Sequence, residues 1–372
     1  MRKILTLIVV LLLTKGVGAQ VFSNKVVGEK HSEERDSLVV AEYPYMLPIL
    51  GKKVTQMGFD LPYSAGLSMQ YVWQESDIVI NNLSIGFNNS QMFALDEIVR
   101  FNNATATTSG VNFRPDVWVF PFLNVYGIFA RSQNTTAVDF GLYAPGNFSI
   151  NEGTLEWEWT SVMEAKTKAN FEATSFGIGM TPTIGVAGGF LALDMNFTWT
   201  DIPELERPTH IFIFGPRLGK TFQFKKPESN IAIWVGGFRV RMKSETSGSL
   251  ATTDLMPDYY EKVDNGIEKV DQAYQAVEDT WNSLPLSERL KPQNILKYEA
   301  AKKSLDLAGG VLDAASRAES VQYDLDKRPK MMWNFIIGSQ YQYNKHLMFR
   351  GELGFLAART QVIAGIQYRF GL

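Results

Sequence analysis

The final segment of the chain, residues 330–372, alternates between apolar and polar side chains in steps of two. The pattern restarts after Asn344-Lys345 and again after Arg359-Thr360, so it divides into three runs. Successive side chains of a strand point to opposite faces, and short connections between such runs are typical of neighbouring antiparallel strands. The segment therefore predicts a three-stranded meander with one apolar face that ends in aromatic residues and one polar face.

A soluble β-sandwich also has one wet face, so the front of the chain is needed to separate the two interpretations. Residues 1–19 have the pattern of a secretory signal peptide, with Arg2 and Lys3 before the apolar run 4–13. Small residues precede a cleavage site after Ala19. The alternative, an uncleaved anchor, is disfavoured because the apolar run is shorter than the ~20 residues that a spanning helix needs.

Composition limits the remaining classes. The chain has 372 residues and a net charge of -3. It contains no cysteine, and this excludes disulfides, thiol chemistry and a lipoprotein anchor. The near-neutral charge gives no reason to expect a nucleic-acid partner. No later apolar run is long enough for a membrane helix, but the half-apolar strands of a membrane barrel remain possible.

The same alternation recurs through residues 61–243, where we count nine strands. Residues 114–130 are the weakest part of the pattern, because they are apolar on both parities and contain Pro115 and Pro121. Together with the last three runs the count is about twelve. We predict an all-β fold: an antiparallel transmembrane β-barrel of about twelve strands, formed by residues 61–243 and 330–372, after an N-terminal segment at 20–60.

These features resemble the outer-membrane β-barrel proteins of Gram-negative bacteria. The ending Gly365, Tyr368 and Phe370 matches the glycine and aromatic spacing by which that class is recognised during assembly, although the chain continues to Gly371-Leu372. The resemblance implies residence in the bacterial outer membrane, contact with outer-membrane lipid and recognition by the barrel assembly machinery. It names no subfamily.

Residues 244–329 interrupt the barrel pattern. From about Asp258 the apolar spacing becomes helical, and two seams flank a stretch that contains Pro285 and Pro292. We predict a helical hairpin in this insertion, which is also a candidate surface for a protein partner. Three positions are open: a cap at the cell surface, a plug in the lumen, or a periplasmic module.

Catalytic candidates are weak. Asp201, Glu204, Glu206 and His210 lie close together and supply carboxylates and one base, as a rim enzyme acting on lipid requires. Their spacing is not diagnostic, and a solvated loop with a rim histidine is the favoured interpretation. We expect no cofactor and no metal.

Charged residues on the polar parity carry more information about function. The predicted lumen-lining set is Glu156, Glu158, Asp194, Asn196, Arg217, Arg239, Arg241, Lys243, Arg350 and Glu352. Such charges can pair and close the lumen, or line a wet path that selects solutes. The run Arg239, Arg241 and Lys243 favours a wall that attracts anions. The leading hypothesis is a channel or binding site for a small polar or anionic solute; the alternatives are a lipid-modifying enzyme and an anchored scaffold that uses the hairpin.

Overall fold

The computed structural model describes residues 32–40, 42–202, 208–226, 228–242, 245–256, 258–356 and 358–372. The predicted signal peptide lies outside these ranges, as do Glu204, Glu206 and Lys243. The described strands form one antiparallel sheet of thirteen strands.

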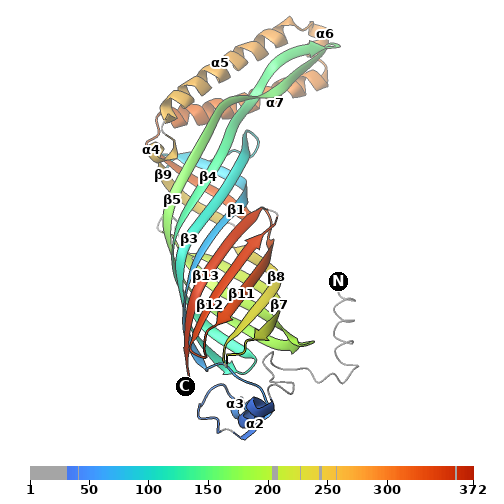
Figure 1. Ribbon diagram of the computed structural model, residues 1–372. Helices are drawn as coiled ribbons and strands as arrows, with labels where there is room; N and C mark the ends of the chain where they lie inside the picture. The colour runs from blue at the N-terminus through green and yellow to red at the C-terminus, as the bar shows by residue number, and fades with distance from the viewer. Residues whose placement is uncertain are drawn as a thin grey trace.

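Ten of these strands close into a ring (Figure 1). In chain order they are β1 (Ala65–Phe87), β3 (Val99–Phe120), β4 (Leu123–Asn151), β5 (Thr154–Val186), β6 (Gly189–Asp201), β7 (Thr209–Gln223), β8 (Asn230–Met242), β11 (Trp333–Gln342), β12 (Leu347–Phe355) and β13 (Arg359–Phe370). The ring closes where β13 pairs with β1, from Ala65 opposite Phe370 to Ser76 opposite Arg359. The predicted antiparallel barrel is confirmed, and the ring has ten strands because three strands lie outside it. These three are β2 (Phe93–Ala94), β9 (Glu245–Ala251) and β10 (Ser320–Pro329).

The barrel wall is tall on one side and short on the other. β4 and β5 have 29 and 33 residues, whereas β6 and β8 have 13 each. A membrane-spanning strand needs only ~9–11 residues, so the tall wall continues far beyond a bilayer. Above Ser76, β1 leaves β13 and pairs with β10 instead, and β10 pairs with β9. The upper part of the tall wall is therefore a sheet in the order β9–β10–β1–β3–β4–β5.

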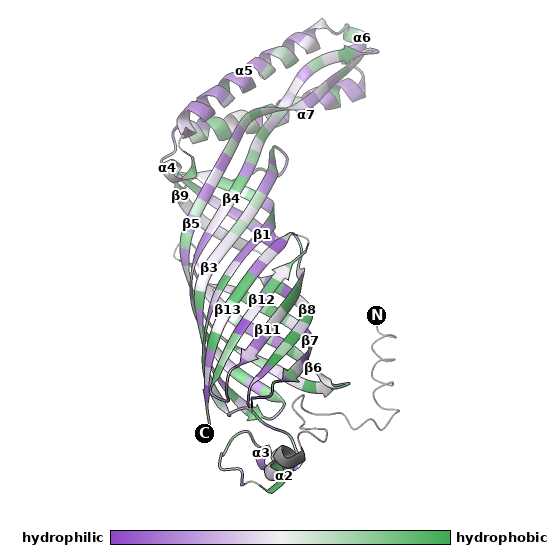
Figure 2. Cartoon of the chain, viewed as in Figure 1, coloured by the Kyte–Doolittle hydropathy of each residue, from purple (hydrophilic) through white to green (hydrophobic). Residues whose placement is uncertain are grey.

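The outer face of the lower barrel is an apolar belt. Every ring strand except β6 carries at least two large, exposed apolar side chains, and β6 carries at least one. Figure 2 shows how hydrophobic and hydrophilic residues are distributed along these strands. Members of the belt include Leu67, Met69, Tyr71, Phe113, Phe129, Phe176, Ile178, Phe197, Leu218, Phe222, Ile233, Val235, Phe335, Ile337, Phe349, Leu353, Ile366 and Tyr368. Higher on β4 and β5 the outer face instead carries exposed ion pairs such as Arg131 with Glu172. An apolar band below a polar extension is the surface expected of a barrel that sits in lipid and projects into water.

The N-terminal segment lies at the end of the barrel where the chain terminates (Figure 1). It contains α2 (Ser32–Val40) and α3 (Gly51–Gln56). The Met46 amide donates to the Leu372 carbonyl at 2.9 Å, and the Leu372 amide donates to Ser64 Oγ at 2.8 Å. These bonds fix both ends of the barrel chain at one rim, where the connections between ring strands are short.

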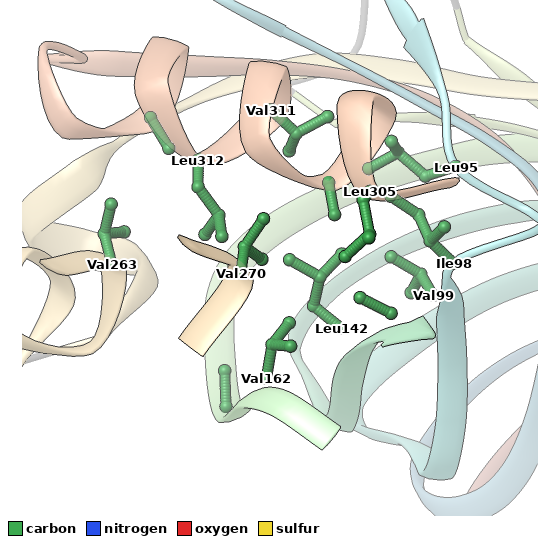
Figure 3. Packing of buried hydrophobic residues seen from close by; sticks show 14 of the residues in the cluster. Leu95, Ile98, Val99, Leu142, Val162, Val263, Val270, Leu305, Val311 and Leu312 are labelled. Atoms are coloured by element: carbon green, nitrogen blue, oxygen red, sulfur yellow. The ribbon is translucent and has the colours of Figure 1, made fainter. Parts of the chain in front are cut away.

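The helical hairpin lies at the opposite end. It consists of α5 (Tyr259–Ser283) and α7 (Pro292–Ser316), joined through α6 (Leu286–Arg289) and preceded by α4 (Thr252–Leu255). Its apolar seams pack on the upper parts of β4 and β5 and on the residues just before β3, so that Val270 and Leu305 share one core with Leu142 of β4 and with Ile98 (Figure 3). The hairpin is thus a roof above the lumen and not a plug within it. No helix in the described ranges is long and apolar enough to cross a membrane.

The buried side-chain amide of Asn294 connects α7 to the turn between β4 and β5. Asn294 is fully buried; its Oδ1 accepts the Leu155 amide at 3.0 Å. Its Nδ2 donates to the carbonyls of Gly153 and Glu288, each at 2.9 Å. No apolar or shorter side chain can satisfy these three backbone groups, so the hairpin depends locally on asparagine.

We expect Asn294→Ala to destabilise the docked hairpin by about 3 kcal/mol, because buried backbone groups lose their partners. Hydrogen exchange in the first turns of α7 should then accelerate at least tenfold while exchange in the ring strands stays unchanged. The control is Gln293→Ala, since the hydrogen bond that Gln293 makes within the described residues, to Thr154 Oγ1 at 3.3 Å, is exposed. Equal exchange in the two variants would contradict the prediction.

Candidate functional site

A cluster of buried charges crosses the lumen of the lower barrel. Arg217 on β7 donates from Nε and Nη2 to the two carboxylate oxygens of Glu352 on β12, at 2.8 and 3.1 Å. Its Nη1 donates to Asp194 Oδ2 on β6 at 3.1 Å. β7 and β12 are separated in the ring by β8 and β11, so the bidentate pair spans the interior and does not follow one wall.

Neutral donors complete this cluster. The Trp234 indole N–H donates to Glu352 Oε2 at 2.9 Å, and the Tyr126 hydroxyl contacts Asp194 and Asn196. Arg350 contributes a second cation at 3.4 Å from Glu352. Two guanidinium groups, of Arg217 and Arg350, therefore contact two carboxylates, of Asp194 and Glu352. A buried pair of this kind is stable only as a set, because removing one partner leaves an uncompensated charge in a low-dielectric interior.

A polar chamber of about 290 Å³ lies below the cluster, on the side of the termini. Asp116 organises its wall: Arg369 Nη2 and Asn124 Nδ2 each donate to Asp116 Oδ1 at 2.8 Å, and Gln367 Nε2 donates to Oδ2 at 2.6 Å. Asp60, Leu61 and Pro62 from the N-terminal segment line the same chamber. Arg114 also lines this chamber; it stands 5.2 Å from the Tyr126 ring, and its Nε finds no hydrogen-bond partner within the described residues. The wall is therefore hydrophilic and carries charges of both signs.

A second chamber, of about 370 Å³, lies above the cluster and below the helical roof. Its walls are mainly apolar side chains of β1, β3, β4 and β10, among them Ile78, Ile80, Phe101, Phe140 and Leu325. Leu83 and Val321 belong both to its lining and to the core beneath the hairpin. The upper ends of the short wall close the other side through residues such as Ile211 and Val240.

A septum of buried side chains separates the two chambers. Along β13, Gly365 lines the lower chamber and Arg359 the upper one, whereas Gln361 between them lines neither. Gln361 and Asn334 are 1% and 4% exposed, and within the described part of the chain their amide nitrogens and oxygens find no hydrogen-bond partner. We define the septum as Asn334, Ile336, Glu352 and Gln361. Unpartnered buried amides are rare in proteins, and here they stand where a path through the lumen would pass.

The structure brings half of the predicted lumen residues together. Asp194, Asn196, Arg217, Arg350 and Glu352 meet in the cluster. Glu156 and Glu158 lie far from it, near the tip of β5, where Glu158 accepts an exposed hydrogen bond from Asn147. The period-two pattern assigned their parity but could not show that β5 continues far beyond the membrane.

Arg239 and Arg241 lie on the outer face of β8, not on the lumen face where the sequence pattern placed them. The neighbouring Ile233 and Val235 are each 44% exposed, whereas Trp234 is 4% exposed and donates into the lumen cluster. Arg239 stacks over the exposed Trp333 ring at 5.9 Å. Both parities of β8 carry apolar residues, so hydropathy alone could not show which of them faces the lumen. The structure places Trp234 inward, where it donates to Glu352.

Of the four catalytic candidates, the structure describes Asp201 and His210; Glu204 and Glu206 lie outside the described residues. Asp201 ends β6 and His210 lies on the outer face of β7, 5.8 Å from the Trp199 ring. Over the residues that the structure describes, no three His, Asp or Glu side chains are placed to hold a metal ion. Of the predicted assembly signal, Gly365 lines the lower chamber and Tyr368 belongs to the belt. Phe370 pairs with Ala65 at the seam.

Several residues of the lumen escaped prediction. Trp234 falls on the parity that the sequence predicts to be apolar, and Tyr126 lies in residues 114–130, where both parities are apolar. A buried tyrosine or tryptophan nevertheless needs a partner for its polar atom. Asn334 and Gln361 lay on the polar parity without a charge to draw attention. Lys327, in the upper chamber, fell within a segment expected to be wholly part of the helical insertion, whereas β9 and β10 flank the helices there.

No known protein family and no curated protein matches the sequence. Solved outer-membrane barrels align with it at low identity and low structural similarity. They include the β-domain of the Bordetella autotransporter BrkA, at 7% identity, 82% coverage of this chain and 100% of that one, with a TM-score of 0.28. The translocator domain of NalP from Neisseria meningitidis aligns at 8%, with 82% and 88% coverage and a TM-score of 0.30. A FadL homologue from Pseudomonas aeruginosa aligns at 7%, with 85% and 92% coverage and a TM-score of 0.25.

The chain's own geometry assigns its class. The closed ring and the exposed apolar belt are those of an outer-membrane β-barrel.

Proposed function

We propose that the protein binds a small solute in its lumen and passes it between the upper and lower chambers across the bacterial outer membrane. The observation that carries this proposal is the stacking of two cavities in one barrel with a septum between them. The conformation described is the closed one, because the Arg217–Glu352 pair spans the lumen.

If the interior of the barrel served only to stabilise the fold, side chains would fill it. Barrels of eight strands are just wide enough for side chains to fill them, and a ring of ten strands has only slightly more space. This chain leaves cavities of about 290 and 370 Å³ instead, each comparable to a ligand pocket. The amides of Asn334 and Gln361 supply unused donors and acceptors between them.

The ion pair between Arg217 and Glu352 acts as the gate in this proposal, because it crosses the lumen. Arg217 is held to Glu352 by two charge-assisted hydrogen bonds, which are the strongest contacts across the lumen that we find in the described residues. Opening requires Arg217 and Glu352 to separate. The lower chamber offers other polar side chains that these two groups could then contact. An anion-attracting wall at Arg239 and Arg241 is not part of the proposal, because both side chains face outward.

Glu352→Gln should raise the open probability of the purified barrel in planar bilayers by about tenfold or more, since a charge-assisted bond is worth about 1.5–3 kcal/mol over a neutral state. Glutamine keeps the shape and removes the charge that holds Arg217. Arg239→Ala with Arg241→Ala is the matched control and should leave conductance unchanged. If folded Glu352→Gln barrels are as silent as the wild type, passage through this lumen is excluded as the function.

A further inference from the structure

Two cations and no carboxylate line the upper chamber among the described residues. Lys327 on β10 lies among apolar walls, where its Nζ donates to Thr136 Oγ1 at 3.0 Å and stands 5.8 Å from the Phe171 ring. Of the described residues that line the chamber, Lys327 and Arg359 carry charge and none is a carboxylate. Burial without a negative partner lowers the pKa of Lys327 to about 8.

Arg359 stands at the floor of the same chamber. It is 3% exposed, and its Nη1 has no hydrogen-bond partner within the described residues. Its other contacts are long: Nε to Ser76 Oγ at 3.4 Å and Nη2 to the Met331 carbonyl at 3.5 Å. A buried guanidinium group normally uses its donors on carboxylates or carbonyls in a fixed fork. Here part of the fork is unused.

Arg217 and Arg369 in the lower barrel form ion pairs with carboxylates, whereas no carboxylate lines the upper chamber beside Lys327 and Arg359 in the described residues. An isolated cation in an apolar cavity destabilises the fold unless something offsets the lost hydration. An anionic group supplied from outside would do so. Threonine, serine and amide side chains also line the chamber, but its apolar part, which includes Ile78, Ile80 and Phe140, is long enough to suit a hydrocarbon chain.

We propose that the upper chamber binds a single-chain anionic amphiphile, with its carboxylate on Lys327 and Arg359 and its acyl chain along the apolar walls. The proposal names the solute class for the function proposed above. It rests on that function only for the direction of transport, because binding in the chamber does not require the septum to open.

Binding of an anion in the upper chamber should depend on pH, because Lys327 can lose its proton. The titratable side chains that line the chamber in the described residues are Lys327, Arg359 and Tyr323. Lys327 is cationic below about pH 8 and neutral above it, so it attracts an anion at neutral pH and stops doing so as pH rises. Arg359 stays charged and keeps a weaker, pH-independent attraction.

The test is calorimetric titration of decanoate into the full-length protein in nanodiscs, with empty nanodiscs subtracted to remove partitioning into lipid. Decanol and decyltrimethylammonium serve as neutral and cationic probes of the same chain length. We expect decanoate to bind more tightly than either, and Lys327→Met to weaken decanoate by about tenfold to a hundredfold, as expected for a bond to a charged group. Decanol should bind wild type and Lys327→Met alike.

The matched control is Lys166→Met, which removes an exposed lysine on the outer face of β5 whose Nζ lies 3.5 Å from Asp139. It should bind decanoate as the wild type does. Raising the pH from 7 to 9.5 should weaken decanoate binding to the wild type but not to Lys327→Met. Methionine removes a buried charge, so a failure of that variant to fold is not expected, and heat-modifiability on gels verifies the barrel.

Equal affinity of wild type and Lys327→Met for decanoate, or equal affinity of the wild type for decanoate and decanol, would overturn the inference. A silent Glu352→Gln channel together with charge-dependent decanoate binding would leave the binding site standing and remove transport. A Glu352→Gln barrel that conducts, in a protein that does not bind decanoate, would support passage through the lumen and remove the proposed binding site.

Discussion

Replacing Arg217 with methionine is expected to destabilise the barrel by about 3–5 kcal/mol, the largest effect of any single substitution in the lumen. The Glu352 and Asp194 carboxylates would remain buried with their main cation gone. Arg350 cannot compensate, because it contacts Glu352 through one hydrogen bond at 3.4 Å and makes none that we find to Asp194 in the described structure. The urea concentration at which the barrel unfolds in lipid, followed by tryptophan fluorescence, measures the change.

Two comparisons make the result specific. Arg239→Met removes an arginine from the outer face of the adjacent strand and should shift the midpoint little, since exposed charges contribute at most about 1 kcal/mol. Adding Glu352→Gln to Arg217→Met should recover part of the loss, because one of the two stranded carboxylates is then neutral. If the double variant were less stable than Arg217→Met by the full cost of Glu352→Gln alone, the two side chains would be independent and the cluster would not be a unit.

Leu305→Ala is expected to destabilise the docked hairpin by about 2–5 kcal/mol, because it removes a fully buried side chain and leaves a cavity. Leu305 lies in the core shared by α7, α5 and the upper strands, next to Val270 and Ile98 (Figure 3). The loss should be local. Hydrogen exchange should rise by at least an order of magnitude throughout α5 and α7, while the lower ring strands keep their protection.

Leu296→Ala provides the matched control. Leu296 is on the same helix and is 66% exposed, so the same chemical change should have almost no effect on exchange. Similar exchange in the Leu305 and Leu296 variants would show that the hairpin is not held by its apolar core. Loss of protection in β11–β13 would show instead that roof and barrel unfold as one unit.

The meander at the end of the chain was predictable because each of its strands has one clear apolar parity. Phe335, Ile337, Phe349, Leu353 and Ile366 face outward as expected. Lipid contacts the outer face of every ring strand, so the alternation in sequence is a direct consequence of the solvent. The hairpin was predictable for a similar reason, since its seams repeat at helical spacing and pack on one side.

The prediction weakened wherever both faces of a strand are apolar. On β8 the lumen side carries Trp234 and Phe238, so hydropathy could not tell which parity meets lipid. The sequence indicates about twelve strands, and the sheet has thirteen, of which ten close the ring. The pattern could not show which of them lie outside the ring, or that the residues around Phe140 and Trp157 belong to the upper parts of the long strands β4 and β5.

The sequence by itself determined that this chain forms a closed antiparallel barrel with a helical insertion, because period-two and helical apolar spacing are local properties that one strand or helix displays alone. Only the tertiary structure decided that the barrel holds two chambers, that Arg217 reaches Glu352 across the lumen, and that Lys327 stands in a mainly apolar cavity whose described lining includes no carboxylate. These facts depend on which strands meet around the ring and on how far the tall wall rises. Neither is encoded in the spacing of residues along a single strand.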